Sequence, residues 1–410
     1  MLSSIKVDTS ALVALIETKL HIKRDIVQVN NVVNSSKLII FTEVMRIERL
    51  KLANYKNYND VDLTFDPHVN IIHGPNGSGK TNLLDALHYL SVSKSYFSLS
   101  DKNLIKHDAD FFRLEGHYEV GERKEHVTIK YGLGKRREIQ INSSKLSKVQ
   151  ELIGKYPVVM IAPDDIKIVK GTSKDRRDYF NKWLCQSDPK YLESLMKYNR
   201  LLRQKDQLLK QPYSPNQLSV ESYNHKMVPL AERIHALIKE TMATYTPKMI
   251  DQYLKISNGQ DEINLSYESN LEEGSIAKQY AEKIEDEIRY RRPLIGIQRD
   301  EYLLEIKDMP IRKYGSQGQI KSLLYALRLA EYSFLHSKLN RKPLLLLDDY
   351  FEKLDKSRLQ SLITLVQDGS FGQVFLSDTE LDRSKEIFES RGIKFASFEV
   401  NEGRVTRITS

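Results

Sequence analysis

The sequence is poor in cysteine and has no long uninterrupted run of apolar residues. Cys185 is the single cysteine among 410 residues, so an internal disulfide is excluded and a reducing compartment, the cytoplasm, is expected. No apolar run approaches the roughly 20 residues that cross a bilayer, which excludes the core of a membrane enzyme or transporter. Glycine is used only 18 times. Three of these glycines nevertheless fall within the six positions 74–79.

This glycine-rich stretch lies between an apolar run and a helical pattern, in NIIHGPNGSGKTNLLDALHYL at 70–90. Gly74, four further residues and then Gly79-Lys80-Thr81 have the spacing of a phosphate-binding loop. The preceding apolar run, Val69 to Ile72, is typical of a buried strand, and leucines at helical spacing follow the loop. We predict that the N–H groups of the loop and the N-terminus of the helix bind the phosphates of ATP. The expected contacts are Gly74, Pro75, Asn76, Gly77, Ser78, Gly79, Lys80 and Thr81.

Two of these residues have side chains with separate predicted roles. Lys80 would reach the β and γ phosphates, and the Thr81 hydroxyl would bind Mg²⁺. A second candidate ligand for Mg²⁺ lies in the run PLLLLDD at 343–349, in which four leucines are followed by two aspartates. This pattern is typical of a buried parallel strand that ends at a site. We expect Asp348 to bind Mg²⁺ and Asp349 to orient the attacking water. The alternative is a core strand followed by an acidic turn without a role at the site.

A serine and two glycines precede the helical pattern Ile320 to Leu339, in YGSQGQ at 314–319. A serine at a helix start offers its hydroxyl and free N–H groups to an anion. Ser316, Gly318 and Gln319 are therefore candidate nucleotide contacts, and an ordinary helix cap is the alternative.

The pattern of the chain changes twice along its length. From Met45, three alternating strand patterns lead into the loop, further strands follow at 112–116, 127–132 and 138–141, and a last one lies at 157–162. Helical segments then dominate, among them 191–210 and 220–245, with strands at 262–267 and 302–306. We predict an α/β chain with a first ATPase segment at 45–165, a mainly helical lobe at 166–335 and a second ATPase segment at 336–410.

Positive charge exceeds negative charge, giving a net charge of +8 and a pI near 9.1. Such a balance permits an anionic partner such as nucleic acid, although a single basic cluster is more often a solvated surface. The candidate DNA contacts are Arg176, Arg177, Arg200 and Arg203.

The chain resembles the ATPase heads of the ABC superfamily in the order of its motifs. These are the phosphate loop, the Ser-x-Gly-Gln helix, the strand that ends in Asp348 and then Leu354-Asp355. The resemblance implies a mixed β-sheet with a helical second lobe. It also implies that two heads dimerise on ATP, so that Ser316 and Gly318 complete the nucleotide site of the partner. Leu354-Asp355 matches the loop that communicates between the two sites.

Within that superfamily the chain resembles the RecF family from Met45 to the C-terminus. The similar stretches are LANYKNY at 52–58, TNLLDALHYLSVSKSYF at 81–97, APDD with IVKGTSKDRRDYFNKWL between 162 and 184, YLESLMKYNRLLRQKDQLLK at 191–210 and GIQRD at 296–300. The chain departs from the family pattern at Phe97, at Ser173 and in the Ile-Gln of GIQRD, which puts special roles of these positions in doubt. Ser377-Asp378 occupies the region of the transporter switch histidine, so transporter-like turnover is not implied.

The RecF resemblance implies an ATP-dependent homodimer that binds single-stranded and gapped duplex DNA. It also implies partnership with RecR and RecO in loading RecA, a weak DNA-stimulated ATPase activity and no membrane partner. Three alternatives are another SMC-like or anti-phage ATPase head, a transporter ATPase subunit, and a DNA scaffold with an inactive nucleotide site. We expect residues 1–44 to come from a misread start site rather than a species-specific extension, with the native N-terminus at or next to Met45.

Overall fold

The computed structural model describes residues 43–211, 215–257, 259, 261–349 and 363–408. Within them, six strands form an antiparallel sheet in the order β2-β1-β4-β5-β6-β7. These strands are β1 (Met45–Tyr55), β2 (Tyr58–Thr64), β4 (Phe111–Val120), β5 (Arg123–Gly132), β6 (Glu138–Ile141) and β7 (Ser144–Lys145). Buried and partly exposed residues alternate along β4, as expected for a sheet with one face on the core and one toward solvent. The strands predicted at 112–116 and 127–132 are confirmed as β4 and β5, and both are longer than predicted.

A second six-stranded sheet has the order β15-β14-β3-β13-β12-β8 and is parallel except for β15. Its strands are β3 (Val69–His73), β8 (Val158–Ile161), β12 (Leu344–Leu347), β13 (Val374–Asp378), β14 (Ala396–Asn401) and β15 (Arg404–Ile408). Successive residues of a strand point to opposite faces, and here both faces are buried. Leu345 and Leu347 belong to one hydrophobic core and Leu344 and Leu346 to the other. The four consecutive leucines therefore follow from burial on two sides.

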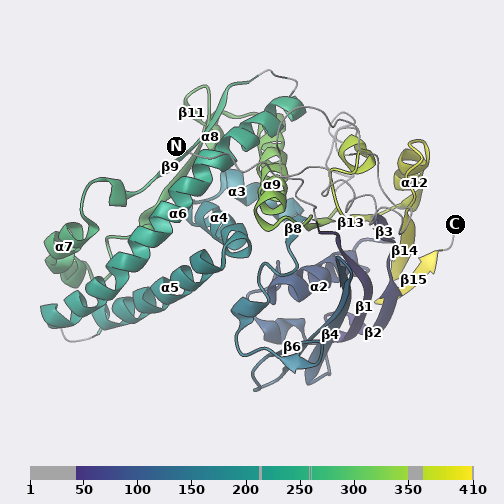
Figure 1. The fold of residues 1–410 in the computed structure, drawn as a ribbon, viewed down its shortest axis with the longest axis horizontal. Helices are drawn as coiled ribbons and strands as arrows, with labels where there is room; N and C mark the ends of the chain where they lie inside the picture. The colour runs from purple at the N-terminus through teal and green to yellow at the C-terminus, as the bar shows by residue number, and fades with distance from the viewer. Residues whose placement is uncertain (1–42, 212–214, 258, 260, 350–362, 409–410) are drawn as a thin grey trace, which may run out of the picture. The chain divides into compact units, whose positions relative to one another are not determined.

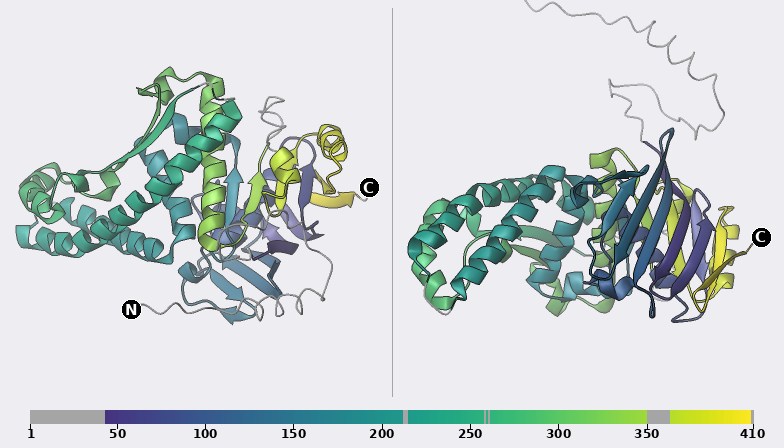
Figure 2. Two further views of the ribbon diagram at one scale, coloured as in Figure 1. Left: turned by 45° about the horizontal axis from the view of Figure 1, so that its top comes forward. Right: turned by 90° about the horizontal axis from the view of Figure 1, so that it is seen from below.

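Helix α2 (Lys80–Val92) lies between the two sheets (Figures 1 and 2). Its residues Leu83, Leu84, Leu87 and Leu90 are buried in the same core as the inner face of the antiparallel sheet and one face of the mixed sheet. The helix that follows the phosphate loop is therefore fixed on two sides, which fixes the loop at its N-terminus.

The other face of the mixed sheet packs against the helical lobe (Figure 1). Its helices are α3 (Ile166–Lys170), α4 (Ser173–Ser187), α5 (Pro189–Leu209), α6 (Gln217–Ser257), α7 (Ile276–Tyr290), α8 (Ile311–Tyr314) and α9 (Gln317–Leu339), and its three strands are β9 (Ile263–Glu268), β10 (Glu301–Ile306) and β11 (Met309–Pro310). Helix α12 (Leu381–Glu389) follows β13. No helix of the described residues is both long enough and apolar enough to cross a membrane.

Two boundaries differ from the sequence prediction. Helix α6 continues twelve residues past the predicted end at 245 although it contains Pro229 and Pro247, because buried residues such as Met249 and Tyr253 continue its helical spacing. Helix α9 crosses the predicted segment boundary at 335 and ends at Leu339.

A buried ion cluster joins the helical lobe to the ATPase segments. Arg328 of α9 pairs with Asp165, which follows β8, at 2.9 Å and with Glu331 at 2.8 Å. The Arg328 guanidinium also donates to the hydroxyl of Tyr96, a residue of the loop that follows α2. Because all these charges are paired away from water, removing one partner would leave an uncompensated buried charge.

Candidate nucleotide site

The phosphate loop turns sharply between β3 and α2, and two of its glycines are required by geometry. Gly74 and Gly79 have φ values of 144° and 123°, in the region that side chains disfavour. A Cβ at Gly74 would collide with the carbonyl of Val400, and one at Gly79 would collide with the side-chain amide of Asn57. The predicted strand, loop and helix are therefore all present, with the glycines where the backbone approaches other groups most closely.

Residues at the turn between β1 and β2 bind the carbonyl groups of the phosphate loop. Tyr58 donates its hydroxyl to the Gly79 carbonyl at 2.8 Å, and Asn57 Nδ2 donates to the Ser78 carbonyl at 2.9 Å. Asn82 of α2 in turn donates to Asn57 Oδ1 at 2.8 Å. With their carbonyls bound from this side, the loop residues keep their shape without a ligand. Asn57 and Tyr58 belong to LANYKNY at 52–58, and the sequence alone indicated no role for them at the site.

Lys80 is buried and folds back over the loop. Its Nζ donates to the carbonyls of Gly74 at 2.7 Å and Pro75 at 3.0 Å. An ammonium group is attracted more strongly by negatively charged phosphate oxygens than by neutral carbonyls, so phosphates would displace the carbonyls. Lys80 therefore stands at the position that the phosphate-loop prediction requires.

Thr81 and Asp348 meet at the C-terminal edge of the mixed sheet. The Thr81 hydroxyl donates to the two Asp348 oxygens at 2.9 and 3.1 Å. Two oxygen ligands on an octahedral Mg²⁺ at about 2.1 Å also lie about 3 Å apart, so the pair fits this ion. Burial raises the pKa of Asp348 to about 6 against hydrogen bonds from Thr81 and Ser377. A carboxylate whose charge is disfavoured by burial is one that a cation would stabilise.

Asp349 has a left-handed backbone with φ of 45°. Its N–H donates to Ser377 Oγ at 2.8 Å, and that same hydroxyl donates to Asp348 Oδ1 at 3.0 Å. Ser377 of β13 thus connects the two carboxylate-bearing residues, a role that sequence reasoning missed. A cavity of about 210 Å³ beside Asp348 and Asp349 is lined also by Lys321, Leu324 and Tyr325. The cavity leaves room for water next to Asp349.

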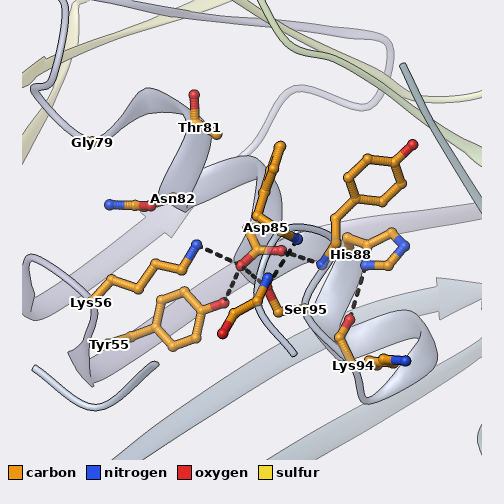
Figure 3. Close-up of polar contacts among 12 residues, drawn as sticks. Tyr55, Lys56, Gly79, Thr81, Asn82, Asp85, His88, Lys94 and Ser95 are labelled. Carbon is orange, nitrogen blue, oxygen red and sulfur yellow. Dashed lines mark hydrogen bonds and ion pairs between the residues drawn. The ribbon is translucent and has the colours of Figure 1, made fainter. Parts of the chain in front are cut away.

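Behind the loop, Asp85 of α2 is fully buried and accepts four hydrogen bonds or ion pairs (Figure 3). Tyr55 OH, Ser95 Oγ and the Tyr96 N–H donate to it at 2.9, 2.8 and 2.7 Å, and Lys56 Nζ pairs with it at 2.7 Å. Asp85 thus ties α2 to β1 and to the loop after α2. The sequence signal for this cluster is an aspartate among the leucines of a helix expected to be buried.

Ser316 begins α9 and is exposed, with a capping box to Gln319. The Ser316 hydroxyl accepts the Gln319 N–H at 3.2 Å, and Gln319 Oε1 accepts the Ser316 N–H at 2.8 Å. The predicted cap is present, and the role of Ser316, Gly318 and Gln319 toward a nucleotide stays a prediction. Leu354-Asp355 lies outside the described residues.

The four arginines predicted to contact DNA do not share one surface environment. Arg176 is 6% exposed and its guanidinium contacts the Gly171 carbonyl at 3.2 Å and Glu301 at 3.6 Å, so its selection as a DNA contact was wrong: its side of α4 packs inward. Arg177 is half-buried and donates to the Asp300 carbonyl at 2.7 Å. Arg200 and Arg203 are exposed on α5 and stay candidates.

Comparison with known proteins is consistent with this architecture. The chain matches the family model of the RecF/RecN/SMC N terminal domain over residues 46–395. The DNA replication and repair protein RecF of Cytophaga hutchinsonii is 32% identical over 365 residues, covering 88% of this chain and 96% of that protein. RecF of Parabacteroides distasonis is 35% identical over 361 residues, covering 88% and 99%.

Solved structures agree in fold. A structure of the recombination mediator protein RecF-ATPrS in the RecFOR pathway has a TM-score of 0.81 at 24% identity, covering 90% of this chain and 100% of that one. A Pyrococcus furiosus Smc head domain bound to the C-terminal domain of ScpA has a TM-score of 0.53 at 16% identity, covering 89% and 97%. The predicted ABC-type ATPase head and the predicted RecF resemblance are both confirmed. The chain belongs to the RecF family of DNA replication and repair proteins.

Proposed function

We propose that this chain is an ATP-dependent DNA-binding protein of recombinational repair that acts in the cytoplasm and hydrolyses ATP slowly. The proposal rests on one observation: Lys80, Thr81 and Asp348 lie together at the N-terminus of α2. Family membership supports the DNA repair role, and this geometry supports its dependence on ATP.

In the proposed ATP complex, Lys80 leaves the Gly74 and Pro75 carbonyls and binds the β and γ phosphates. The loop N–H groups and the N-terminus of α2 bind the remaining phosphate oxygens. Thr81 and Asp348 would hold Mg²⁺, which when bound would neutralise part of the triphosphate charge. The contacts from Asn57 and Tyr58 support this step, because a loop that is already shaped loses less conformational entropy on binding.

For hydrolysis we propose that Asp349 accepts a hydrogen bond from the attacking water and orients it. The water oxygen forms a bond to the γ phosphorus, the bond to the β–γ bridging oxygen breaks, and ADP and phosphate result. The aspartate side chain of Asp349 is one methylene shorter than that of a glutamate. A water held less closely is consistent with slow turnover.

The nucleotide site would be completed by a second copy of the chain. Ser316 is exposed at the start of α9, a 23-residue helix whose dipole favours an anion at this end. With Gly318 and Gln319 it would contact the γ phosphate bound by the partner. ATP then favours the dimer only through contacts that the monomer does not make.

In the dimer, exposed basic residues of both copies, including Arg200 and Arg203 on α5, would bind the DNA backbone. Gapped duplex and single-stranded DNA are the proposed ligands, and RecR, RecO and RecA the proposed protein partners. Neutralised phosphates release counterions, so the affinity should fall steeply with salt.

Analytical sedimentation with gapped DNA tests the proposal. The chain is run with ADP or ATP and Mg²⁺, then with gapped DNA, and then with RecR added. We expect ATP alone to produce a dimer and the dimer to bind DNA more tightly than the ADP form. A monomer at saturating ATP, or equal DNA affinity with ADP and ATP, would refute it.

A further inference from the structure

The solvent-facing side of the antiparallel sheet carries a cluster of three potential metal ligands, Glu115, His117 and His126, called here the His-Glu cluster. Glu115 and His117 are two residues apart on β4, so their side chains share one face. His126 lies on β5 directly opposite His117 in the strand register. Gly116, between the two β4 residues, faces Leu90 of α2. The cluster is therefore on the opposite face of the sheet from the helix that begins at the phosphate loop.

The donor atoms of the His-Glu cluster lie close together. One ligand atom from each residue falls within 4.8 Å of the other two. His126 Nε2 lies 3.0 Å from Glu115 Oε2, and the two imidazoles stack with centroids 4.4 Å apart. Two ligands at about 2.1 Å on a tetrahedral Zn²⁺ lie about 3.4 Å apart. The Glu115–His126 pair nearly has this spacing, and His117 would have to turn out of its stack with His126 to direct its nitrogen at the same ion.

His117 has an unsatisfied nitrogen within this cluster. Its Nε2 is buried and has no hydrogen-bond partner in the described part of the chain. Leaving a polar atom buried and unpaired is unfavourable, and a metal ligand bond would remove this penalty. A neutral imidazole nitrogen that has no other partner is the form that binds metals.

The surroundings fix the ligands and limit the choice of ion. Arg113 pairs with Glu115 Oε1 at 2.5 Å and leaves Oε2 for the cluster. The His126 N–H donates to Asn142 Oδ1 at 2.8 Å, which holds the backbone of β5. The positive charges of Arg49 and Arg113 oppose any cation. Two imidazoles favour Zn²⁺ and similar transition metals over Mg²⁺ and Ca²⁺, which prefer oxygen ligands.

We propose that Glu115, His117 and His126 form a three-ligand site for Zn²⁺ or a similar divalent transition metal, with water at the fourth position. Glu115 Oε2, His117 Nε2 and His126 Nε2 are the ligand atoms. The bound ion would cross-link β4 to β5 by side chains as well as by backbone hydrogen bonds. The site is separate from the Mg²⁺ position at Thr81 and Asp348 and does not require a nucleotide.

The test is a titration of the untagged, nucleotide-free protein with Zn²⁺ by calorimetry and with Co²⁺ by visible absorption. Tags that contain histidine must be removed because they bind both ions. We expect one Zn²⁺ per chain and the intense d–d absorption of four-coordinate Co²⁺. Zn²⁺ should also raise the melting temperature, since an ion that binds only the folded state stabilises it.

His126→Ala and Glu115→Gln should each weaken Zn²⁺ binding at least tenfold. Glu115→Gln retains an acceptor for His126 and keeps the sheet folded, so it remains informative if a histidine variant does not fold. His107→Asn is the matched control, because His107 is exposed away from the cluster, and it should bind Zn²⁺ as the parent does. ATP affinity should be unchanged in all three variants. No Zn²⁺ binding by the parent, or equal binding by parent and Glu115→Gln, would overturn the proposal.

Discussion

Replacing Asp348 by asparagine should stabilise the nucleotide-free protein at neutral pH while weakening its Mg²⁺-dependent binding of ATP. The pKa of Asp348 is raised from 3.8 to about 6, mainly by burial. The folded state therefore binds the proton more tightly than the unfolded state, and this contribution to stability is present below pH 4 and lost as the pH rises through 6. A shift of about two pKa units corresponds to roughly 3 kcal/mol at neutral pH. Asparagine carries no charge, so it removes this penalty.

The gain should be about 1–3 kcal/mol, because asparagine accepts weaker hydrogen bonds than a carboxylate does. Urea unfolding of parent and Asp348→Asn in EDTA, without nucleotide, at pH 7.5 and pH 4.5 measures it. The gain should be full at pH 7.5 and about a third as large at pH 4.5. Asp164→Asn is the control, since Asp164 is exposed, and it should change stability by less than about 0.5 kcal/mol. An Asp348→Asn variant no more stable than the parent at pH 7.5 would refute the reasoning.

The remaining predictions concern nucleotide binding, hydrolysis and assembly. Lys80→Ala should lower ATP affinity at least a hundredfold in fluorescent-nucleotide titrations while the circular dichroism spectrum stays unchanged; unchanged affinity would contradict the proposed phosphate contact. Gly79→Ala should also abolish ATP binding and should lower the melting temperature, because its Cβ would collide with Asn57 and take up an unfavourable φ. Asp349→Asn should keep ATP bound and trap the dimer in sedimentation, and hydrolysis at the parental rate would show that Asp349 does not orient water. Ser316→Arg should bind ATP but stay monomeric. Mixing it with Lys80→Ala allows one intact composite site, so ATPase activity should partly recover, whereas no recovery at any mixing ratio would argue against completion of the site by a second copy.

The parts of the site that sequence reasoning found are those encoded by contiguous residues. The strand, loop and helix around Lys80 and the four leucines before Asp348 are local patterns with a direct physical cause. Ser377 and Asn57 were assigned no role at the site because each acts on residues distant in the chain, Asp348 and Ser78. A serine or asparagine in a strand or turn has no local feature that reports such a contact.

Arg176 shows a different limit. Counting charges in Lys174 to Arg177 gives a basic cluster, but the count does not say which side of α4 packs against β10. Tyr179, Phe180 and Trp183 are buried on that helix, and Arg176 lies three and four residues before the first two, on the same side. Helical spacing from these aromatic residues would have indicated that Arg176 points inward.

The pairing of β12 with β8 has a consequence for how this protein can vary. The chain leaves the mixed sheet after β8 at Ile161 and returns to it in β12 at Leu344, and these two strands are direct parallel neighbours. β8 ends beside Leu347, whereas β12 begins beside Val158, so the two ends of the long insertion lie at opposite edges of one pair of strands. Within the insertion, α9 packs in the core of the mixed sheet and its Arg328 pairs with Asp165, so this helix has little freedom to vary. Changes in length are best tolerated in exposed loops of the lobe away from the sheet, where they leave Asp348 in place.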